Sequence, residues 1–260
     1  MKKKFENRIA LITGASQGIG RVIASRFAEE GADLFICARN AGPLEEVAKE
    51  LRGKGVKVVP YAADISVQDA VRAMIEYGLQ ELGQIDILVN NAGAFKASRF
   101  VEYSLEDFDR VMKVNLYGVF HVTQAVLPNM MKRRKGKIIN IASTAGKWGS
   151  RNQSAYNASK HAVVGLTRSI GLEMAPYKIN VNAICPSLVD TYKAKSFFEE
   201  HSRILGIPEE DFFQKIMAQI PMKQFIKPEE IAELAIYLAS DESDSITCQS
   251  FLLCGGHVMV

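Results

Sequence analysis

The sequence predicts an α/β fold, a doubly wound parallel sheet of about seven strands with helices on both faces. Short apolar runs alternate along the chain with longer amphipathic runs, which is the pattern of strand–helix–strand units. The short runs are continuously apolar or β-branched, as expected of strands covered on both faces. No internal repeat, low-complexity segment or Pro/Gly-rich linker interrupts the 260 residues. Residues 1–260 are therefore predicted to form one domain.

The predicted strands follow one another along the whole chain. They are Arg8–Ile12, Leu34–Cys37, Val56–Pro60, Ile85–Val89, Lys137–Ile141, Ile179–Ile184 and Ser250–Leu253. The runs between them have helical periodicity, for example Arg21–Glu30 before Gly31 and Pro43–Leu51 before Gly53. A glycine just past the last periodic residue is a helix stop. A further helix is expected to begin at Pro228.

The segment 191–221 departs from this alternation. It is long and lies between the sixth strand and the helix expected at Pro228, and its aromatic residues are Tyr192, Phe197, Phe198, Phe212 and Phe213. A connection of this length with helical pieces of its own is usually a functional lid or binding loop. We therefore expect a helical substrate lid, and the alternative is a helical hairpin that only covers the sheet.

The overall charge argues against a nucleic-acid partner. The net charge is +3, from 32 basic and 29 acidic residues, whereas a nucleic-acid binder concentrates basic residues on one face. The two basic runs, Lys2–Lys4 and Lys132–Lys135, are expected to be solvated, the first in a terminus and the second in a loop leading into a strand.

The cysteine and histidine patterns predict no metal site. Cysteines occur at Cys37, Cys185, Cys248 and Cys254, and histidines at His121, His161, His201 and His257, without the spacing of metal ligands or a redox pair. Cys37 and Cys185 lie in apolar strands and should be buried, reduced thiols. The chain has neither a signal-peptide core nor an apolar stretch of the ~20 residues that span a bilayer, so we expect a cytoplasmic protein without a membrane partner.

A glycine-rich turn follows the first predicted strand. Residues 13–20 read Thr-Gly-Ala-Ser-Gln-Gly-Ile-Gly and lead into the first helix. Glycines there permit a tight turn and let backbone N–H groups approach a pyrophosphate at the positive end of the helix. Three residues separate the first two glycines, unlike the commonest dinucleotide fingerprint. The predicted cofactor-binding residues here are Gly14, Ser16, Gln17, Gly18, Ile19 and Gly20.

The end of the second predicted strand indicates which dinucleotide binds. A ribose 2′-hydroxyl is best held by a carboxylate, whereas a 2′-phosphate repels a carboxylate and favours a guanidinium. Ala38 occupies the position of such an acid, and Arg39 follows it. NADP(H) is therefore expected in preference to NAD(H), with Arg39 and the adjacent Asn40 at the cofactor. The alternative is an exposed arginine without a ligand contact.

A tyrosine and a lysine are spaced for acid/base chemistry. Tyr156 and Lys160 lie one helical turn apart, on the same face. An unperturbed tyrosine has a pKa of ~10 and is a poor base at neutral pH, and a nearby cation stabilises the phenolate. This pair can therefore exchange a proton with a substrate, although the same spacing also occurs on solvated helix faces.

Together these residues resemble the short-chain dehydrogenase/reductase family over nearly the whole chain. The matching pieces stand in the family's order: Thr13–Gly20, Asp64, Asn90–Gly93, Asn115, Ser143, Tyr156 with Lys160, Pro186 and Thr191. The resemblance implies a Rossmann-type fold and a hydride transfer between a nicotinamide cofactor and a carbonyl compound or secondary alcohol. The small-molecule substrate would be a carbonyl, a polyol or sugar, or a 3-oxoacyl compound. A cofactor-binding sensor or scaffold of the same fold is the alternative.

The resemblance also implies the role of each catalytic residue. Ser143 would hydrogen-bond the substrate oxygen, and Tyr156 would give or take its proton. Lys160 would bind the nicotinamide ribose and lower the pKa of Tyr156. Asn115 would hold a water molecule in a proton relay, or could simply bond a helix carbonyl. Alternatively, Ser143 could simply form a turn at the end of a strand.

Further residues would line the cofactor. Asp64 and Ile65 would contact the adenine, although Asp64 could instead form a turn or a helix cap. The remaining cofactor-binding residues implied by the resemblance are Asn91, Ala92, Gly93, Pro186 and Thr191. Thr191 would meet the carboxamide or the phosphates where the lid begins.

The chain departs from the family at three places. Ser187 stands where a glycine usually follows the proline, Cys248 replaces a common glycine, and Cys254 replaces a common acid before two glycines. The first could shift the turn near the nicotinamide. The other two affect the last strand, which in the family often lies at a subunit interface.

The substrate pocket would combine Ala94-Phe95, the segment 144–153 with Trp148, and the aromatic lid. Lys147 and Arg151 lie in that segment, so a substrate with an anionic group is a further hypothesis.

Two helical segments suggest self-association. Leu105–Met131 and Ala155–Ala175 carry wide apolar faces that include Val111, Val114, Val119, Phe120, Val122 and Val126. The family commonly pairs these helices across a two-fold axis. A homo-oligomer, a tetramer or a dimer, is therefore expected.

Overall fold

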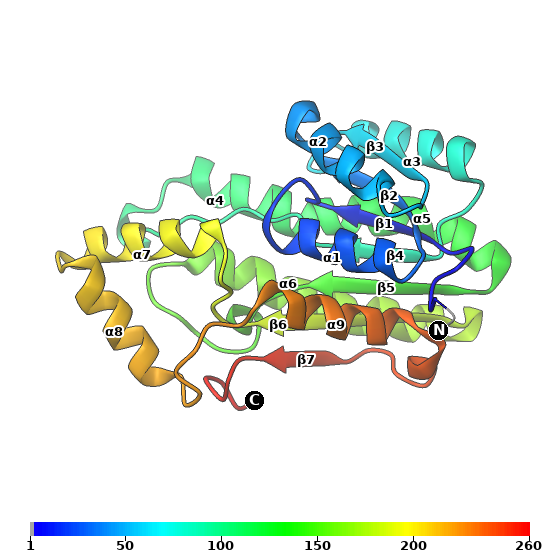
Figure 1. Cartoon of the computed structure of the whole chain (residues 1–260). Helices are drawn as coiled ribbons and strands as arrows, with labels where there is room; N and C mark the ends of the chain where they lie inside the picture. The colour runs from blue at the N-terminus through cyan, green and yellow to red at the C-terminus, as the bar shows by residue number, and fades with distance from the viewer. Residues whose placement is uncertain (1–2) are drawn as a thin grey trace.

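The computed structural model describes residues 3–260, apart from the side chains of Tyr192 and Lys193. Its centre is a seven-stranded sheet in the order β3-β2-β1-β4-β5-β6-β7, and every pairing is parallel (Figure 1). The strands are β1 (Ile9–Thr13), β2 (Asp33–Ala38), β3 (Val58–Ala62), β4 (Ile87–Asn90), β5 (Gly136–Ile141), β6 (Ile179–Pro186) and β7 (Ser250–Leu253). The order reverses between β1 and β4, and ligands of such sheets bind at the carboxyl ends of the strands near this point.

Helices cover both faces of the sheet. They are α1 (Gly18–Glu29), α2 (Ala41–Arg52), α3 (Gln68–Leu82), α4 (Leu105–Met112), α5 (Gly118–Arg133), α6 (Ser154–Met174), α7 (Tyr192–Leu205), α8 (Glu209–Gln219) and α9 (Pro228–Ala239). On one face α1, α2 and α9 bury side chains such as Phe27, Leu44 and Ile231. On the other face α3 and α5 bury Met74 and Val122 against the sheet, and α6 packs on β6.

The predicted fold class is confirmed, and all seven predicted strands lie within two residues of their expected bounds. The largest shift is in β3, which begins at Val58 and not at Val56. The N–H of Lys57 bonds the Asp33 carboxylate at 2.8 Å, so the pairing of β3 with β2 starts only after Lys57. Gly31 ends α1 as expected, since its φ of +86° is in the left-handed region. Pro228 is the first residue of α9, also as expected.

The helical segment expected over Leu105–Met131 is not continuous. A five-residue π-helix, Lys113–Tyr117, separates α4 from α5. Such π-turns are rare and occur frequently at functional sites. The basic run 132–135 also differs from the expectation of a solvated loop, because Lys132 and Arg133 end α5. Arg133 bonds the buried Asp86 carboxylate at 2.5 Å.

The apolar residues expected on a subunit-facing surface are mostly internal. Val111, Val119, Val122 and Val126 are buried within the chain, and only Phe120 of that set is exposed, by 41%. Val122 and Val126 pack in the apolar cluster between α5 and the sheet, and Val119 shares a cluster with Ala183 and Cys185 of β6.

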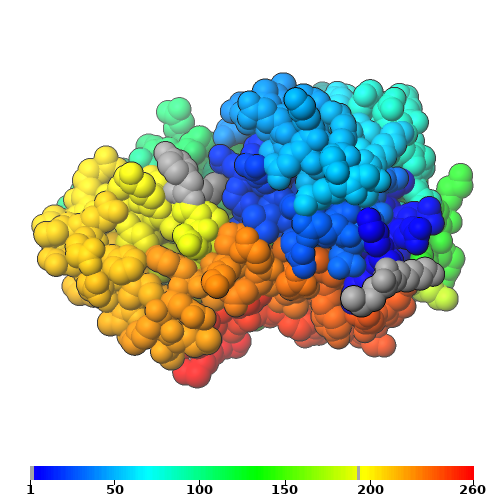
Figure 2. Space-filling model, in the orientation of Figure 1, coloured from blue at the N-terminus to red at the C-terminus, as the bar shows by residue number. Residues whose placement is uncertain are grey.

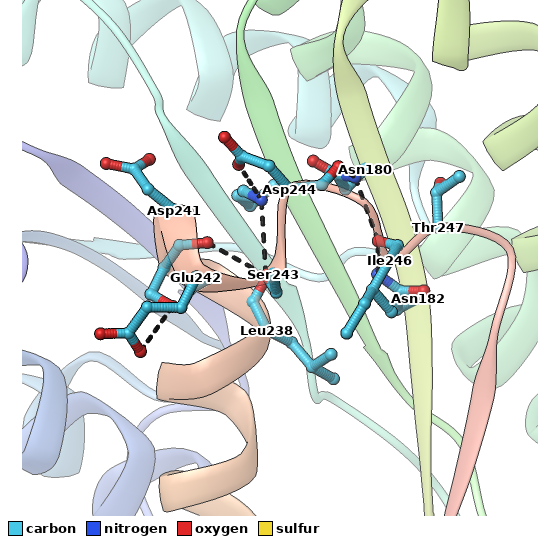
Figure 3. Close-up of polar contacts among 12 residues, drawn as sticks. Asn180, Asn182, Leu238, Asp241, Glu242, Ser243, Asp244, Ile246 and Thr247 are labelled. Atoms are coloured by element: carbon cyan, nitrogen blue, oxygen red, sulfur yellow. Dashed lines mark hydrogen bonds and ion pairs between the residues drawn. The ribbon is translucent and has the colours of Figure 1, made fainter.

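A network of asparagine side chains positions the last strand (Figure 3). Asn180 donates to the carbonyls of Asp244 and Ile246 at 2.9 and 3.0 Å. Asn182 donates to Ile246 O at 2.8 Å and accepts from the N–H of Gln249 at 3.0 Å. These bonds hold the connection from α9 against β6, so β7 begins in register and delivers the C-terminal segment to the carboxyl end of the sheet.

Over the described part of the chain, no helix is long and apolar enough to cross a bilayer. Within residues 3–260 no three histidine, cysteine or acidic side chains gather where they could hold a metal ion. Cys37 and Cys185 are both buried free thiols, as predicted.

Candidate active site at the carboxyl end of the sheet

The glycine-rich turn forms a cradle between β1 and α1. Gly14 and Gly18 have φ values of +67° and +55°. A Cβ atom on Gly20 would lie 2.3 Å from the carbonyl oxygen of Gly14, so this approach is open only to glycine. Gln17 is the N-cap residue of α1 and its side chain makes no capping hydrogen bond. The first N–H groups of α1 are thus left for an anion, and the cradle fits a dinucleotide pyrophosphate.

The side chains of Thr13 and Asn91 hold this cradle against β4. Thr13 Oγ1 accepts from the N–H groups of Asn91 and Ala92 at 3.0 and 3.1 Å. Asn91 Nδ2 donates to the carbonyls of Thr13 and Gly14 at 2.9 and 3.2 Å. Asn91 and Ala92 therefore hold the glycine-rich turn in its conformation. Their predicted contact with the cofactor itself stays a prediction.

The end of β2 lies beside the cradle, and the carbonyl of Cys37 accepts from Ala15 N at 3.1 Å. Ala38 is buried, Arg39 is exposed, and Asn40 caps α2. Within residues 3–260 the Arg39 guanidinium has no acidic partner, whereas Arg21 and Arg52 pair with Glu50 and Glu45. A cation without a carboxylate at this place fits a 2′-phosphate.

Asp64 forms a turn, which was the alternative to its predicted contact with the adenine. Its Oδ1 accepts from the N–H and hydroxyl of Ser66 at 2.9 and 2.7 Å. The Ile65 side chain is buried beneath α5, where a Cβ on Gly118 would meet it at 2.5 Å. Any contact of Ile65 with an adenine would therefore come from its main chain.

Ser143, Tyr156 and Lys160 meet where β5 and β6 end. Ser143 caps the short 3-10 helix Thr144–Gly146, its Oγ accepting from Ala145 N at 3.1 Å and donating to Pro186 O at 3.4 Å. The Ser143 hydroxyl also hydrogen-bonds the phenol of Tyr156. Lys160 Nζ donates to Ile141 O at 2.8 Å and lies 5.6 Å from the centre of the Tyr156 ring. Ser143 and the Tyr156–Lys160 pair, predicted from separate motifs, thus form one cluster.

Two opposing effects act on the phenol of Tyr156. Burial raises the pKa of Tyr156, and the hydrogen bond from Ser143 lowers it by less. The pKa of Tyr156 is therefore raised, because the phenolate is desolvated at this buried position. The lowering expected from Lys160 stays a prediction.

Asn115 lies in the π-helix and is fully buried. Its Oδ1 accepts from Ala94 N at 2.7 Å, and its Nδ2 donates to Ala94 O and Ser159 Oγ at 2.9 and 3.0 Å. Ser159 donates in turn to Tyr156 O at 2.8 Å. A Cβ on Gly93 would lie 3.4 Å from Asn115 Oδ1 and 3.9 Å from Lys160 Nζ. The Asn115 side chain therefore braces the loop after β4, and the water relay stays a prediction for its main chain.

The lid begins next to the cradle. Thr191 is the N-cap residue of α7, and a Cβ on Gly18 would lie 3.9 Å from its methyl group. From there α7 and α8 form a lobe beside the main body, coloured yellow to orange in Figure 2. The predicted helical pieces of 191–221 are thus present, and Thr191 lies where a ligand of the cradle would pass.

An aromatic cluster joins Tyr156 to this lid. The Phe95 ring lies 5.2 Å from the Tyr156 ring and 5.8 Å from that of Phe197 in α7. His201 lies 4.3 Å from Phe197 and stacks on Phe212 of α8 at 5.4 Å. The substrate side of the phenol is therefore lined by aromatic side chains.

Two polar contacts hold α7 down over the site. Glu200 Oε2 accepts from Ala97 N at 2.7 Å. The imidazole of His201 contacts the carbonyls of Phe197 and Arg151 at 2.9 and 3.4 Å. Burial lowers the pKa of His201, so this ring is neutral at pH 7 and can donate to one carbonyl at a time.

Lys147 does not face the substrate side. Its Nζ donates to Ser250 Oγ at 2.9 Å, and Ser250 is at the amino end of β7, opposite the catalytic end. Lys147 therefore gives no support to the hypothesis of an anionic substrate group, because its ammonium bonds Ser250. For Arg151, the other residue of that hypothesis, it stays a prediction.

The sequence did not indicate Glu200, His201 or His257 as site residues. Each contacts a partner far away in the chain: Glu200 reaches Ala97, and His257 bonds Ser187. No local spacing encodes such pairs, and the aromatic richness of residues 191–221 was the one available signal.

Comparisons with known proteins agree with this geometry. The family model described as short chain dehydrogenase matches residues 8–202. The 3-oxoacyl-(acyl-carrier-protein) reductase FabG of Thermotoga maritima is 38% identical over 256 residues, which cover 98% of this chain and 100% of the reductase.

Solved structures are similar over the same extent. An NAD+-bound xylitol dehydrogenase superposes with a TM-score of 0.95 at 33% identity, covering 98% of this chain and 100% of the other. A variant of actinorhodin polyketide ketoreductase with NADPH has a TM-score of 0.92 at 40% identity. The match covers 96% of this chain and 97% of the ketoreductase. The two structures differ in cofactor, so a nicotinamide cofactor is common to both and its phosphorylation state is not.

Proposed function

Because this chain belongs to the short-chain dehydrogenase/reductase family, we propose that it is an NADP(H)-dependent reductase of ketones with Tyr156 as general acid/base. Family membership makes it an oxidoreductase of the ketoacyl reductase and polyol dehydrogenase kind, acting on CH–OH or C=O groups. The observation that carries the proposal is the cluster of Ser143, Tyr156 and Lys160 at one end of the sheet.

Tyr156 is suited to give a proton to a developing alkoxide. Its raised pKa keeps the phenol protonated at neutral pH, and that is the form needed for reduction. The Ser143 hydroxyl, which bonds the phenol and Pro186 O, can turn to the same substrate oxygen. The cofactor supplies the hydride when it is bound. The proton added to the oxygen comes from Tyr156.

The cradle and the end of β2 are the places for the cofactor. The uncapped first turn of α1 would hold the pyrophosphate, and Arg39 would pair with a 2′-phosphate. Lys160, beside Gly93 and Tyr156, would meet the nicotinamide ribose. The preference for NADP(H) rests on Ala38 and Arg39, since a hydroxyl-binding carboxylate does not stand at either position.

The substrate is a partly apolar compound with a ketone or a secondary alcohol group. Phe95 and Phe197 form the wall next to the phenol, and Lys147 points away from it. Three classes fit this wall: a 3-oxoacyl thioester, a vicinal diketone and a ketose or polyol. The first and the last are the classes named for similar proteins.

The test is the oxidation of NADPH and NADH by the purified protein against an acetoacetyl thioester, a diketone and a ketose. We expect NADPH consumption with one class and a loss of more than ~10²-fold in kcat for Tyr156→Phe, since proton transfer by a positioned side chain contributes 10²–10⁴-fold. Tyr237→Phe, at an exposed position of α9, is the matched control. Tight NADPH binding with no turnover of any class would favour the cofactor-binding sensor or a substrate outside these three classes.

A further inference from the structure

The C-terminal segment folds back onto the end of β6. Gly255 and Gly256 follow β7 with φ values of +55° and +84°, and the N–H of His257 bonds Cys254 O at 2.9 Å. This tight turn brings His257 Nδ1 to 2.9 Å from Ser187 Oγ. Ser187 stands where a glycine is usual in the family, and a glycine could not make this bond.

The Ser187 contact fixes one peptide group next to the catalytic serine. Ser187 N donates to Leu253 O at 2.9 Å, while its hydroxyl bonds His257. The same peptide group carries the Pro186 carbonyl, which accepts the hydroxyl of Ser143 at 3.4 Å. The C-terminal segment therefore holds this peptide from one side, and Ser143 contacts it from the other.

His257 also contacts the segment on the other side of Ser143. Its ring lies 4.9 Å from that of Trp148, at an interplanar angle of 76°. Trp148 N bonds Thr144 O in the turn that Ser143 caps. The Trp148 carbonyl accepts from Asn157 Nδ2 at 2.9 Å, and Asn157 adjoins Tyr156.

Packing alone does not account for a histidine at this position. The second ring nitrogen, Nε2, is buried and has no partner within residues 3–260. A buried unsatisfied nitrogen is costly, and a phenylalanine would contact Trp148 without that cost. Burial lowers the pKa of His257, so the ring is neutral at pH 7 and shares one proton with the Ser187 hydroxyl.

We propose that His257 and Ser187 are positioning residues, which set the direction of the Pro186 carbonyl and through it the direction in which Ser143 presents its hydroxyl. Ser143 must exchange Pro186 O for the substrate oxygen in each turnover. The 3.4 Å contact is long for a hydroxyl donor, so it orients the hydroxyl and releases it readily. This inference rests on the proposed reductase function and extends it to two residues outside the catalytic cluster.

The test compares two substitutions of the same histidine. His257→Phe keeps a ring against Trp148 and loses the bond to Ser187. His257→Asn loses the ring, but its amide can take the place of Nδ1. Ser187→Ala removes the partner, and a double variant joins it with His257→Phe. The control is His161→Phe, which removes an exposed imidazole whose Nδ1 also lies 2.9 Å from a carbonyl oxygen.

We expect His257→Phe and Ser187→Ala each to lower kcat about tenfold, within the ~10²-fold that a misplacement of 1 Å can cost. The double variant should be no slower than either single one, because both remove the same bond. His257→Asn should recover most of the kcat. The Kd for NADPH, measured by fluorescence, and the melting temperature should stay close to those of the wild-type protein.

A wild-type kcat in His257→Phe would overturn the inference. So would a His257→Asn protein as slow as His257→Phe, or additive losses in the double variant. A fall in kcat that comes with an equal loss of NADPH binding would show a structural role only. Absence of turnover in the wild-type protein would instead overturn the proposed function, and this inference with it.

Discussion

The phenol of Tyr156 and the guanidinium of Arg39 lie at opposite ends of the candidate site and in opposite surroundings. Tyr156 is in contact with Ser143 and the ring of Phe95, and its pKa follows from its burial. Arg39 is exposed, so its charge acts only on a ligand that comes within hydrogen-bond distance. The first residue therefore bears on the chemical step, and the second on the choice of cofactor.

Arg39→Ala is expected to raise the KM for NADPH by about tenfold or more. A hydrogen bond to a charged group contributes ~1.5–3 kcal/mol, which corresponds to about one to two orders of magnitude in affinity. The KM for NADH should change little, because NADH has no 2′-phosphate. Initial rates with both cofactors give the answer, and Arg72→Ala, an exposed arginine in α3, serves as control. An equal rise for both cofactors would contradict the assignment.

At this scale the sequence predicts the residues that belong to short motifs. Tyr156 and Lys160 are one helical turn apart, and the glycines of the cradle lie within seven residues of one another, so spacing alone indicates them. Glu200 and His201 reach partners 103 and 50 residues away. Their contacts exist only after the lid has packed against the loops, and no periodicity of the chain encodes that packing.

Among the elements, α7 contacts the body of the protein through polar and aromatic side chains. Glu200 bonds the N–H of Ala97, Arg99 donates to Ile204 O at 3.0 Å, and His201 Nε2 lies 3.4 Å from Arg151 O. Aromatic packing between Phe197 and Phe95 adds to these contacts. Such an attachment permits opening without unfolding of the sheet.

Glu200→Ala is expected to loosen the lid. The Ala97 N–H then loses a charge-assisted acceptor, so amide hydrogen exchange over residues 192–219 should become about tenfold faster or more, for a bond of ~1.5–3 kcal/mol. The KM for the carbonyl substrate should rise, while exchange in β4 and β5 stays unchanged. Glu199→Ala is the neighbouring control, since Glu199 is half exposed and lies 3.8 Å from Lys195 of the same helix. Unchanged exchange in α7 would refute the expectation.

An ion pair links the end of α5 to Asp86, just before the central strand β4. Arg133 bonds the Asp86 carboxylate, which also accepts from Ile9 N at 2.9 Å. Arg133→Ala leaves this buried carboxylate without its cation, which should cost about 3 kcal/mol, as for other broken buried pairs. Urea unfolding followed by circular dichroism measures the loss. Lys132→Ala, at an exposed position, should change the free energy of unfolding by less than ~0.5 kcal/mol, and equal effects of the two variants would argue against the pair.

The elements themselves are largely predictable from the sequence. Strands β1, β4, β5 and β6 are buried along their whole length, so apolar runs identify them, and glycines and prolines mark several helix ends. The π-helix at Lys113–Tyr117 could not be predicted. It depends on the bonds between Asn115 and Ala94, which form only when the loop after β4 packs against this helix.

At the scale of the whole molecule, we propose that the protein forms a homo-oligomer, a tetramer or a dimer. The valines named from the sequence are buried within one chain, but the outer sides of α5 and α6 still expose apolar side chains. Tyr117, Phe120 and Leu172 are 51%, 41% and 71% exposed. Exposed apolar side chains on this side of the sheet are candidates for an interaction surface.

Light scattering after size exclusion should give a mass at least twice the 28.7 kDa of one chain. Leu172→Glu is expected to lower that mass, because a charge buried at an interface without a partner is costly. Tyr237→Glu, on the opposite face of the sheet, should leave it unchanged. A monomeric wild-type protein would refute the proposal.

The packing of α1 against α9 has a consequence for synthesis on the ribosome. Ile23 and Phe27 of α1 share one apolar cluster with Ile231 and Ala235 of α9, and Arg26 pairs with Glu233. About 200 residues separate the two helices, so at ~5–20 residues per second the first waits about 10 to 40 s for the second. During that time the part of α1 that packs on α9 is uncovered, which makes it a site where a chaperone could bind the nascent chain.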